Sequence, residues 1–600
     1  MSEISFYYNL DNLRNRFNEW GHMKIAIFAP FAAVWPNSRG EVELAENLVR
    51  EGHEILFLRC DKDFEDFCIS MASQGLSEIS TAEDKLDVCK MCIRTKNFIE
   101  KYMGFPSVNF YKEVNSHVLD LLENEIGRVS STNWMKYSYE GLALGRIAAY
   151  EFFIRHKLTT YEIPISLWNN YLFQLRNTLL TYISAVDFFK NYPREKEGAI
   201  DRVIVSNSYY SSNRVFSIVA ELNGTEAFTI DPAGYIYETS ASYDVQKALN
   251  YEYPVNSKAW VRFSKVPLSI HELRSAGKYV NHLISARSFW TYSSPINEGG
   301  FRSFPEFLDI PKGAKVLLLA MSSADEIFAQ ELIDGISETN LKQSNSLFAS
   351  QLEWIQFVVE NIKNRDDIYL VIRPHPREFP NKRENRKSSQ GSLISDWLTN
   401  SSLPPNVLIN WPDQKISLYQ FLPRVERLLI AWSSVAIEFG IFGKPVISYV
   451  NPYMTLPGEM VSVATSKDEY VEMIIKEIKP ADSLVRSKAA FRWLNFAHQD
   501  SKLRLMPYGW EYIQFYLRVV RILVVRFHIS LPKFFIRHPI HVLRQTQKKK
   551  SAIGAFFDSN LKNVAEFVDT FGDFEISKND EIEEEIAVRE EVRRLWETIS

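Results

Sequence analysis

The sequence predicts an α/β protein built from two doubly wound domains, and three observations carry this prediction. The chain has 600 residues, which exceeds what one hydrophobic core usually serves. Residues 23–58 alternate between an apolar strand, a loop, an amphipathic helix and a second apolar strand. The same alternation returns over residues 314–450. Such alternation is typical of open, mostly parallel sheets, in which ligands lie at the carboxyl ends of the strands.

The N-terminal domain is expected to cover residues 1–300. Its first strand is "MKIAIFAPF", followed by a loop, "AAVWPNSRG", and by a helix that ends at Gly52. Another strand–helix pair is predicted over residues 201–224, after a mostly helical insertion. Residues 240–300 are expected to form helices that lead out of this domain.

The second domain is expected to cover residues 301–500. Its strands are the apolar runs "AKVLLLAMSS", "DIYLVIRPHP", "NVLINWP", "RLLIAWSS" and "KPVISYV", with helical patterns between them. Two doubly wound domains, each with ligand-facing loops, predict a cleft between them.

The C-terminal region changes character twice. Residues 501–550 are expected to form basic amphipathic helices, since residues 514–550 hold nine Lys and Arg and no Asp or Glu. This composition favours contact with an anionic membrane surface. The alternative is that these helices cross back onto the first domain. Residues 551–600 are predicted to form an acidic helical tail, exposed or coiled.

The strand "DIYLVIRPHP" ends in a histidine between two prolines. Pro374 and Pro376 fix the backbone on both sides of His375, and neither can donate to a sheet ladder. Arg373 and Arg377 flank the motif. These residues either cap a turn or face an anionic ligand at the edge of the sheet.

A second motif, "RLLIAWSSVAIEFGIFGKPVISYV", places two serines between a buried strand and a helix. Ser433 and Ser434 would lie where free backbone N–H groups and the helix dipole favour an anion. Glu438, one turn later, is placed to accept hydrogen bonds from ribose hydroxyls. The alternative is a plain helix cap and a solvated glutamate. By the strand-end rule, the two motifs are expected to meet in one crevice.

Residues 322–447, which contain both motifs, resemble the nucleotide-sugar domain of GT-B glycosyltransferases. The resemblance is to capsule or lipopolysaccharide biosynthesis proteins of the Kdo-transferase-like type, and more distantly to polyglycerol-phosphate polymerases. It implies the GT-B fold, with donor phosphates held by His375, Ser433 and Ser434 and with Glu438 near the ribose. It also implies a nucleotide-sugar co-substrate, with CMP expected first and UDP or GDP next.

Inverting enzymes of this type require no metal and use Asp or Glu to deprotonate the acceptor. The first domain must then supply this base. Candidates are Glu41 and Glu43, after "NSRG", and Glu140, which has aromatic neighbours in "YSYEGLALG". Glu140 and Glu41 are the catalytic assignments, and each has a structural role as its alternative.

The four cysteines raise the alternative of a structural zinc site. Cys60, Cys68, Cys89 and Cys92 fall within 33 residues, and the last two form a CxxC. The spacing between Cys60 and Cys68 is atypical for zinc, so reduced thiols in the core are the main expectation, with no metal.

Composition limits location and partners. Net charge is −5, which gives no reason to expect nucleic-acid binding. No signal peptide or spanning helix is expected, and four cysteines fit a reducing cytoplasm. We therefore expect a cytoplasmic transferase, peripheral on the inner membrane face, that extends a glycan or lipid-linked acceptor. The alternatives are a sugar-nucleotide epimerase of the same fold and a non-catalytic glycan-binding scaffold.

Overall fold

The structure is a computed structural model of the chain. It describes residues 22–599, except for 65, 112–114, 196–197, 233–241, 251–256, 287–291, 297–308, 335–345, 382–385, 451–455, 477–480, 501–502, 505–518, 528, 530–555, 558–560 and 570–575.

The first domain contains a seven-stranded sheet in the order β13-β6-β5-β4-β1-β2-β3. The pairs from β5 to β3 are parallel, and β6 and β13 add antiparallel strands at one edge. The strands are β1 (Lys24–Phe28), β2 (Glu54–Arg59), β3 (Ser107–Asn109), β4 (Arg202–Ser206), β5 (Glu226–Pro232), β6 (Ser242–Lys247) and β13 (Leu503–Arg504). Strand β6 is a correction, because residues 240–300 were expected to be helical.

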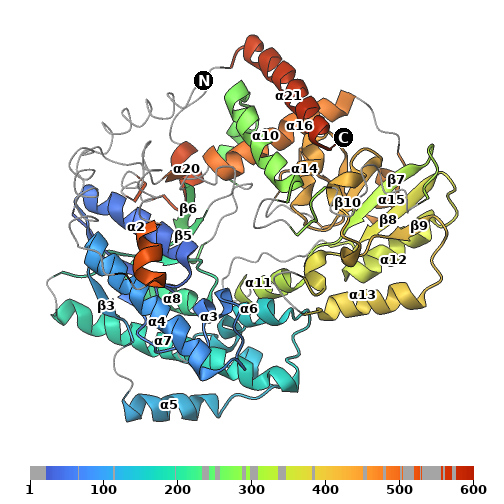
Figure 1. Cartoon of the computed structure of the whole chain (residues 1–600). Helices are drawn as coiled ribbons and strands as arrows, with labels where there is room; N and C mark the ends of the chain where they lie inside the picture. Colours follow the sequence, from blue (N-terminus) through green and yellow to red (C-terminus); the bar gives the residue numbers. More distant parts are fainter. Residues whose placement is uncertain are drawn as a thin grey trace.

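Helices cover both faces of this sheet (Figure 1). The helices of this domain are α2 (Trp35–Arg50), α3 (Ile69–Ser73), α4 (Ala82–Phe98), α5 (Ser116–Ile126), α6 (Leu144–His156), α7 (Trp168–Glu195) and α8 (Ser211–Leu222). Helix α2 begins at Trp35, within the expected loop "AAVWPNSRG". Pro36 explains the earlier start, because proline suits the first helical turn, where its missing N–H costs nothing.

The second domain contains a six-stranded sheet in the order β12-β11-β10-β7-β8-β9, and all its pairs are parallel. This is the doubly wound order, in which the chain adds β8 and β9 on one side of β7 and then returns to add β10, β11 and β12 on the other side. The strands are β7 (Lys315–Ala320), β8 (Ile368–Arg373), β9 (Val407–Ile409), β10 (Val425–Ile430), β11 (Val446–Ser448) and β12 (Ser462–Val463). Two domains with doubly wound sheets confirm the predicted α/β architecture.

The helices of this domain are α12 (Gln351–Ile362), α13 (Ser389–Asn400), α14 (Val435–Ile441), α15 (Lys467–Ile475) and α16 (Ala481–Asn495). The central strands are almost fully buried because helices cover both sheet faces.

The two cores exchange helices across the boundary predicted at residue 300. Helix α10 (Ile270–Ile284), preceded by α9 (Lys258–Phe263), packs into the second core. Helix α11 (Asp325–Asp334) instead buries Ala329, Leu332 and Ile333 in the first core, where it lies beside α6 (Figure 1).

The C-terminal region also connects the domains. Helix α20 (Val564–Asp569) contacts β6, and α21 (Lys578–Ile599) packs on α10 and α16 (Figure 1). The acidic tail is therefore not a solvated helix throughout. Ala587, Val588 and Leu595 are buried in the second core, and Arg492 forms an ion pair of 2.5 Å with the buried Glu584.

Most of the basic segment 501–550 lies outside the described residues. In its described part, Val520 and Val525 pack into the core of the first domain. This matches the alternative in which the segment crosses back onto that domain. Within the part of the chain that the structure describes, no helix combines the length and the apolar character needed to cross a bilayer.

Candidate functional site

A cavity of about 250 Å³ lies at the carboxyl edge of the second sheet. Ala320 and Met321 form its lining at the end of β7. The turns that follow β8 and β10 flank this strand, so the cavity lies where the winding of the sheet reverses. Ligands of doubly wound sheets bind at this position. Five of the six predicted donor-site residues line the cavity: Arg373, His375, Ser433, Ser434 and Glu438.

His375 is held by the short helical turn that follows β8, Pro376–Glu378. Its Nδ1 accepts a hydrogen bond of 3.2 Å from the backbone N–H of Arg377. Burial, together with the charges of Arg377, Arg373 and Lys157, lowers the pKa of His375 to about 3. The imidazole is therefore neutral, and its proton is on Nε2. A neutral imidazole with Nδ1 occupied offers one N–H donor to a ligand.

Arg373 lines the cavity but also supports its wall. Its guanidinium donates to Oδ1 of Asn410 and, at 3.0 Å, to the carbonyl oxygen of Ile416. Burial lowers the pKa of Arg373 to about 10, so the side chain stays cationic at neutral pH. Arg373 thus contributes positive charge while it fixes the segment that leads to Tyr419.

The structure places Arg377 elsewhere. This side chain does not line the cavity, and its guanidinium is buried against α11. There it pairs with Asp325 at 2.9 Å and with Glu326. Arg377 therefore joins the His-Pro turn to α11, and two carboxylates neutralise the charge that was expected to face phosphate.

Ser433 and Ser434 connect β10 to α14. Ser434 occupies the N-cap position, but its hydroxyl makes no capping hydrogen bond to the helix. Both serines line the cavity. The N-cap position falls to Ser434, so the interpretation of Ser433 as a plain N-cap is not what the structure shows.

Glu438 is a buried carboxyl group that lines the cavity. The Tyr419 hydroxyl donates to its Oε1 at 3.4 Å, and its Oε2 has no hydrogen-bond partner among the described residues. Burial raises the pKa of Glu438 to about 7. A buried oxygen without a partner is costly, which favours a ligand hydroxyl beside it.

Three further residues of the site were not predicted from the sequence. Tyr279, His498 and Tyr419 line the cavity, and the rings of Tyr279 and His498 lie 5.5 Å apart. Tyr279 lies on α10, His498 lies on the helical turn Phe496–Asp500 that follows α16, and Tyr419 lies on the turn Leu418–Phe421 after β9. No local pattern marks them, because only the packing of α10 and α16 onto the second domain brings them to this edge.

The two candidate bases do not line the cavity. Glu41 lies on α2, is 4% exposed, and accepts a hydrogen bond of 2.8 Å from the Ser206 hydroxyl at the end of β4. Burial raises the pKa of Glu41 to about 7. Glu43 is also buried, and it pairs with Arg39 at 2.7 Å.

Glu140 is exposed in the turn between Tyr139 and Leu142, at φ 48°. Of the two assignments, Glu41 has the environment of a tuned carboxylate at the carboxyl edge of the first sheet. Glu140 has that of a surface turn.

The cysteines are free thiols. Cys92 Sγ accepts a hydrogen bond of 3.3 Å from the backbone N–H of Ala33. Burial raises the pKa values of Cys60, Cys68 and Cys92, which keeps these thiols protonated. Among the described residues no group of three or more His, Cys, Asp or Glu side chains is arranged to hold a metal ion. The zinc alternative therefore finds no ligand set there.

No family model and no curated protein matches the sequence. Solved structures do match. KpsC of Thermosulfurimonas dismutans, a β-Kdo 2,4 transferase, is 14% identical, with 48% of this chain and 79% of that chain covered and a TM-score of 0.29. The calicheamicin glycosyltransferase CalG4 is 12% identical, with 80% and 95% covered and a TM-score of 0.24. The UDP-GlcNAc 2-epimerase of Neisseria meningitidis is 10% identical, with 83% and 100% covered and a TM-score of 0.23.

Proposed function

We propose that the chain is an inverting, metal-independent GT-B glycosyltransferase. It moves a sugar from a nucleotide-sugar donor to a growing surface polysaccharide of the capsule or lipopolysaccharide type. One observation carries the proposal: His375 and the two serines flank β7 at the point where the sheet winding reverses, and they share the cavity with an oxygen of Glu438 that has no hydrogen-bond partner among the described residues. Hydrogen-bond donors at this edge suit phosphate, and a buried carboxyl oxygen suits ribose hydroxyls.

The reaction divides between the two domains. In the second domain, the N–H of His375, the serine hydroxyls and the charge of Arg373 stabilise the nucleotide phosphate as it leaves the anomeric carbon. In the first domain, a carboxylate takes the proton of the acceptor hydroxyl, whose oxygen forms the new bond to that carbon. Glu41 is the base that we propose, with Glu140 as the second candidate.

The donor nucleotide is proposed to be CMP, with UDP and GDP next, as the family resemblance implies. The acceptor is proposed to be a glycan or lipid-linked glycan. Cytoplasmic location at the inner membrane face is part of the same proposal, because a lipid-linked acceptor is reached from that surface.

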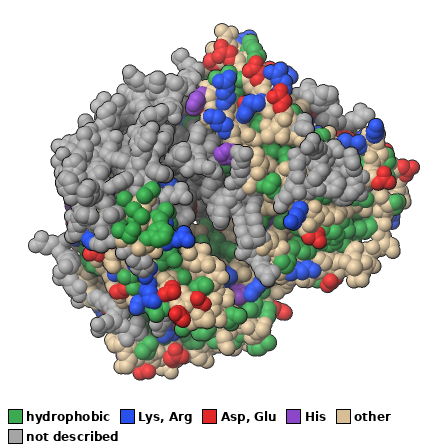
Figure 2. Space-filling view, viewed as in Figure 1, with side chains coloured by type: hydrophobic (Ala, Val, Ile, Leu, Met, Phe, Trp, Pro, Cys, Tyr) green, Lys and Arg blue, Asp and Glu red, His purple; other side chains and the backbone are tan. Residues whose placement is uncertain are grey.

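An exposed apolar and cationic patch supports the membrane part of the proposal. Val519, Phe527 and Ile529 are 37%, 61% and 43% exposed, and the exposed Arg526 lies between Val519 and Phe527 in the sequence. Figure 2 shows hydrophobic side chains gathered on the viewed face of the first domain, over the orange helical turn drawn in front in Figure 1. Residues 530–550 add six Lys and Arg and no acidic residue to the sequence. Apolar side chains beside positive charge suit an anionic lipid surface.

A thermal-shift measurement with CMP, CDP, UDP and GDP tests the nucleotide site, since a ligand that binds the folded state raises Tm by mass action. The test compares the native chain with His375→Ala and with His117→Ala, a control at an exposed histidine of α5. We expect one nucleotide to raise Tm in the native chain and in the control, but not in His375→Ala. An equal shift in His375→Ala would contradict the phosphate-site assignment.

Turnover then distinguishes the reaction classes. Donor hydrolysis or sugar transfer in the presence of EDTA supports a metal-independent transferase. Epimerisation of the donor sugar without an acceptor would identify an epimerase, and nucleotide binding without turnover would identify a scaffold.

A further inference from the structure

Lys157 is a residue of the first domain whose side chain reaches into the second. It follows α6 directly and is 2% exposed. Its backbone is left-handed, with φ 52° and ψ 44°. Glycine adopts this conformation without strain at helix C-termini, whereas other residues do so at a cost. A strained backbone at a residue whose ammonium group is buried indicates that the lysine side chain has a specific role at this position.

The ammonium group of Lys157 binds both ends of the segment that follows His375. Its Nζ donates to the carbonyl oxygen of Arg377 at 2.5 Å and to that of Arg386 at 3.0 Å. Arg377 is two residues beyond His375, and its own N–H is the group that holds Nδ1 of the imidazole. The carbonyl and the N–H of one residue therefore join Lys157 to His375.

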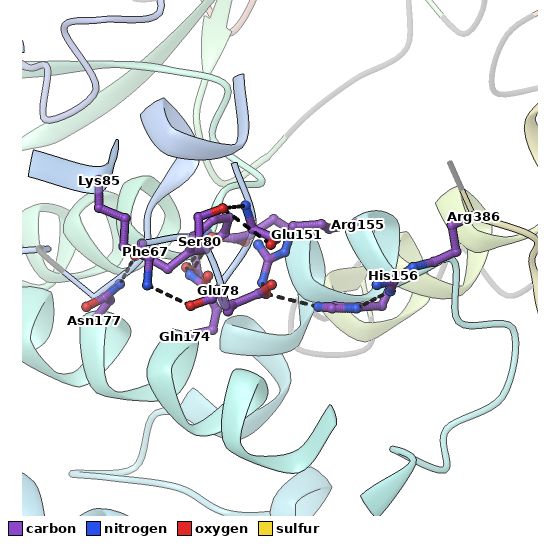
Figure 3. Close-up of polar contacts among 12 residues, drawn as sticks. Phe67, Glu78, Ser80, Lys85, Glu151, Arg155, His156, Gln174, Asn177 and Arg386 are labelled. Atoms are coloured by element: carbon purple, nitrogen blue, oxygen red, sulfur yellow. Dashed lines mark hydrogen bonds and ion pairs between the residues drawn. The ribbon is translucent and has the colours of Figure 1, made fainter. Parts of the chain in front are cut away.

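The end of α6 is itself firmly anchored, as Figure 3 shows. His156 Nε2 lies 3.0 Å from Glu78 Oε1, and Arg155 pairs with the same oxygen at 2.5 Å. His156 Nδ1 contacts the guanidinium of Arg386. Because arginine can only donate, this Nδ1 accepts and the imidazole proton lies on Nε2, toward Glu78.

The carboxyl group of Glu78 stays ionised in this cluster. Burial acts against ionisation, but the hydrogen bond from His156 and the charge of Arg155 lower its pKa to about 2. Lys157 therefore projects from a helix end that is held in place by the contacts of Arg155 and His156 with Glu78.

We infer that Lys157 is a positioning residue of the donor site, through which the first domain sets the geometry of the His375 turn. The inference rests on the proposed function, because it takes His375 as a ligand of the donor phosphate. It adds that the phosphate site of the second domain is complete only when the two domains are docked at the end of α6. Lys157 does not line the cavity, so its effect passes through Arg377 and not through contact with the donor.

The same helix provides a matched control. Arg146, also on α6, donates to the carbonyl oxygen of Glu331 at 3.1 Å. This bond joins α6 to α11, which follows β7 in the chain but packs into the first core, and it also ends on a backbone carbonyl. It reaches the C-terminal end of α11 and not the His375 turn. A general loss of interdomain contact would act alike in variants of Lys157 and Arg146.

The experiment measures Kd for CMP, CDP, UDP and GDP by titration calorimetry, together with Tm, in Lys157→Met, Lys157→Arg, Arg146→Met and His375→Ala. Methionine keeps the apolar stem of lysine and removes the donors. We expect Lys157→Met to weaken the tightest nucleotide about tenfold. Lys157→Arg should recover part of the loss, and Arg146→Met should stay within about twofold, although both Met variants lower Tm to a similar extent. If Lys157→Met does not fold, Lys157→Gly, which suits the left-handed backbone, replaces it.

The outcomes separate the inference from the proposed function. Native affinity in Lys157→Met with lost affinity in His375→Ala would overturn the inference and leave the phosphate site standing. Native affinity in both variants would overturn the phosphate site and the inference with it. Equal loss in Lys157→Met and Arg146→Met would show a general effect of interdomain docking and would also overturn the inference.

Discussion

His375 and Ser433 line one cavity although they follow strands that do not pair with each other. Strand β8 carries the histidine, strand β10 carries the serine, and β7 lies between them. The chain enters the sheet at β7 and winds outward in both directions, which leaves a gap between the helices at the carboxyl edge. Because of this winding the two side chains line the same cavity, although 57 residues separate them in the sequence.

Two replacements of His375 test whether its side chain donates a hydrogen bond to the nucleotide phosphate. His375→Ala removes the donor, and His375→Gln keeps an amide N–H. We expect nucleotide affinity to fall about tenfold or more in the Ala variant and less in the Gln variant. Calorimetric titration measures both, and far-UV circular dichroism verifies the fold. Equal affinity in the native, Ala and Gln forms would rule out a phosphate contact.

Glu438→Gln tests the buried carboxyl group through the pH dependence of stability. Burial raises the folded pKa to about 7, above the usual value of 4.5, so the folded state binds more protons than the unfolded state between these values. This contribution to stability is complete below about pH 4.5 and is lost as pH rises through 7. The neutral Gln variant should therefore gain stability relative to the native chain between pH 5 and pH 8, by on the order of 1–3 kcal/mol. Urea denaturation at the two pH values measures the gain, and a difference independent of pH would contradict the raised pKa.

Glu41→Gln and Glu140→Gln compare the two candidate bases. If Glu41 takes the acceptor proton, its replacement should lower kcat by roughly 10²- to 10⁴-fold and leave the nucleotide Kd unchanged. Because burial raises its pKa to about 7, the native rate should fall as pH drops below 7. Glu140→Gln should keep native kcat under this assignment. The reverse result would transfer the role to Glu140.

Phe527→Glu tests the membrane surface. The native chain should sediment with vesicles that contain an anionic lipid, less with neutral vesicles, and less at high salt, because screening weakens the cationic contribution. The variant adds a negative charge at a side chain that is 61% exposed, so it should lose most of this binding while its Tm is retained. Val261→Glu, at another side chain of 61% exposure, on α9, is the control. Vesicle binding that does not depend on lipid charge or on Phe527 would contradict the assignment.

Local sequence predicted the elements whose burial is continuous. Strands β1, β7, β8 and β10 consist mostly of apolar residues, as expected for central strands of a sheet that is covered on both faces. The His-Pro and Ser-Ser turns were found for the same reason, since each directly follows one of these strands. The start of α2 was missed because Pro36, usually read as a loop residue, is equally suited to a first helical turn.

By itself the sequence determined the two doubly wound sheets and the turn residues of the donor site, because strand burial and strand-end turns are properties of a few consecutive residues. Tertiary structure alone decided the rest. Arg377 lies outside the cavity because it pairs with Asp325 of α11. Tyr279 and His498 line the cavity because α10 and the segment after α16 pack at this edge of the second domain. The tertiary structure also joined Lys157 to the His375 turn across 220 residues. These contacts depend on how amphipathic helices dock onto the two cores, and docking is set by packing between distant segments that leaves no local pattern.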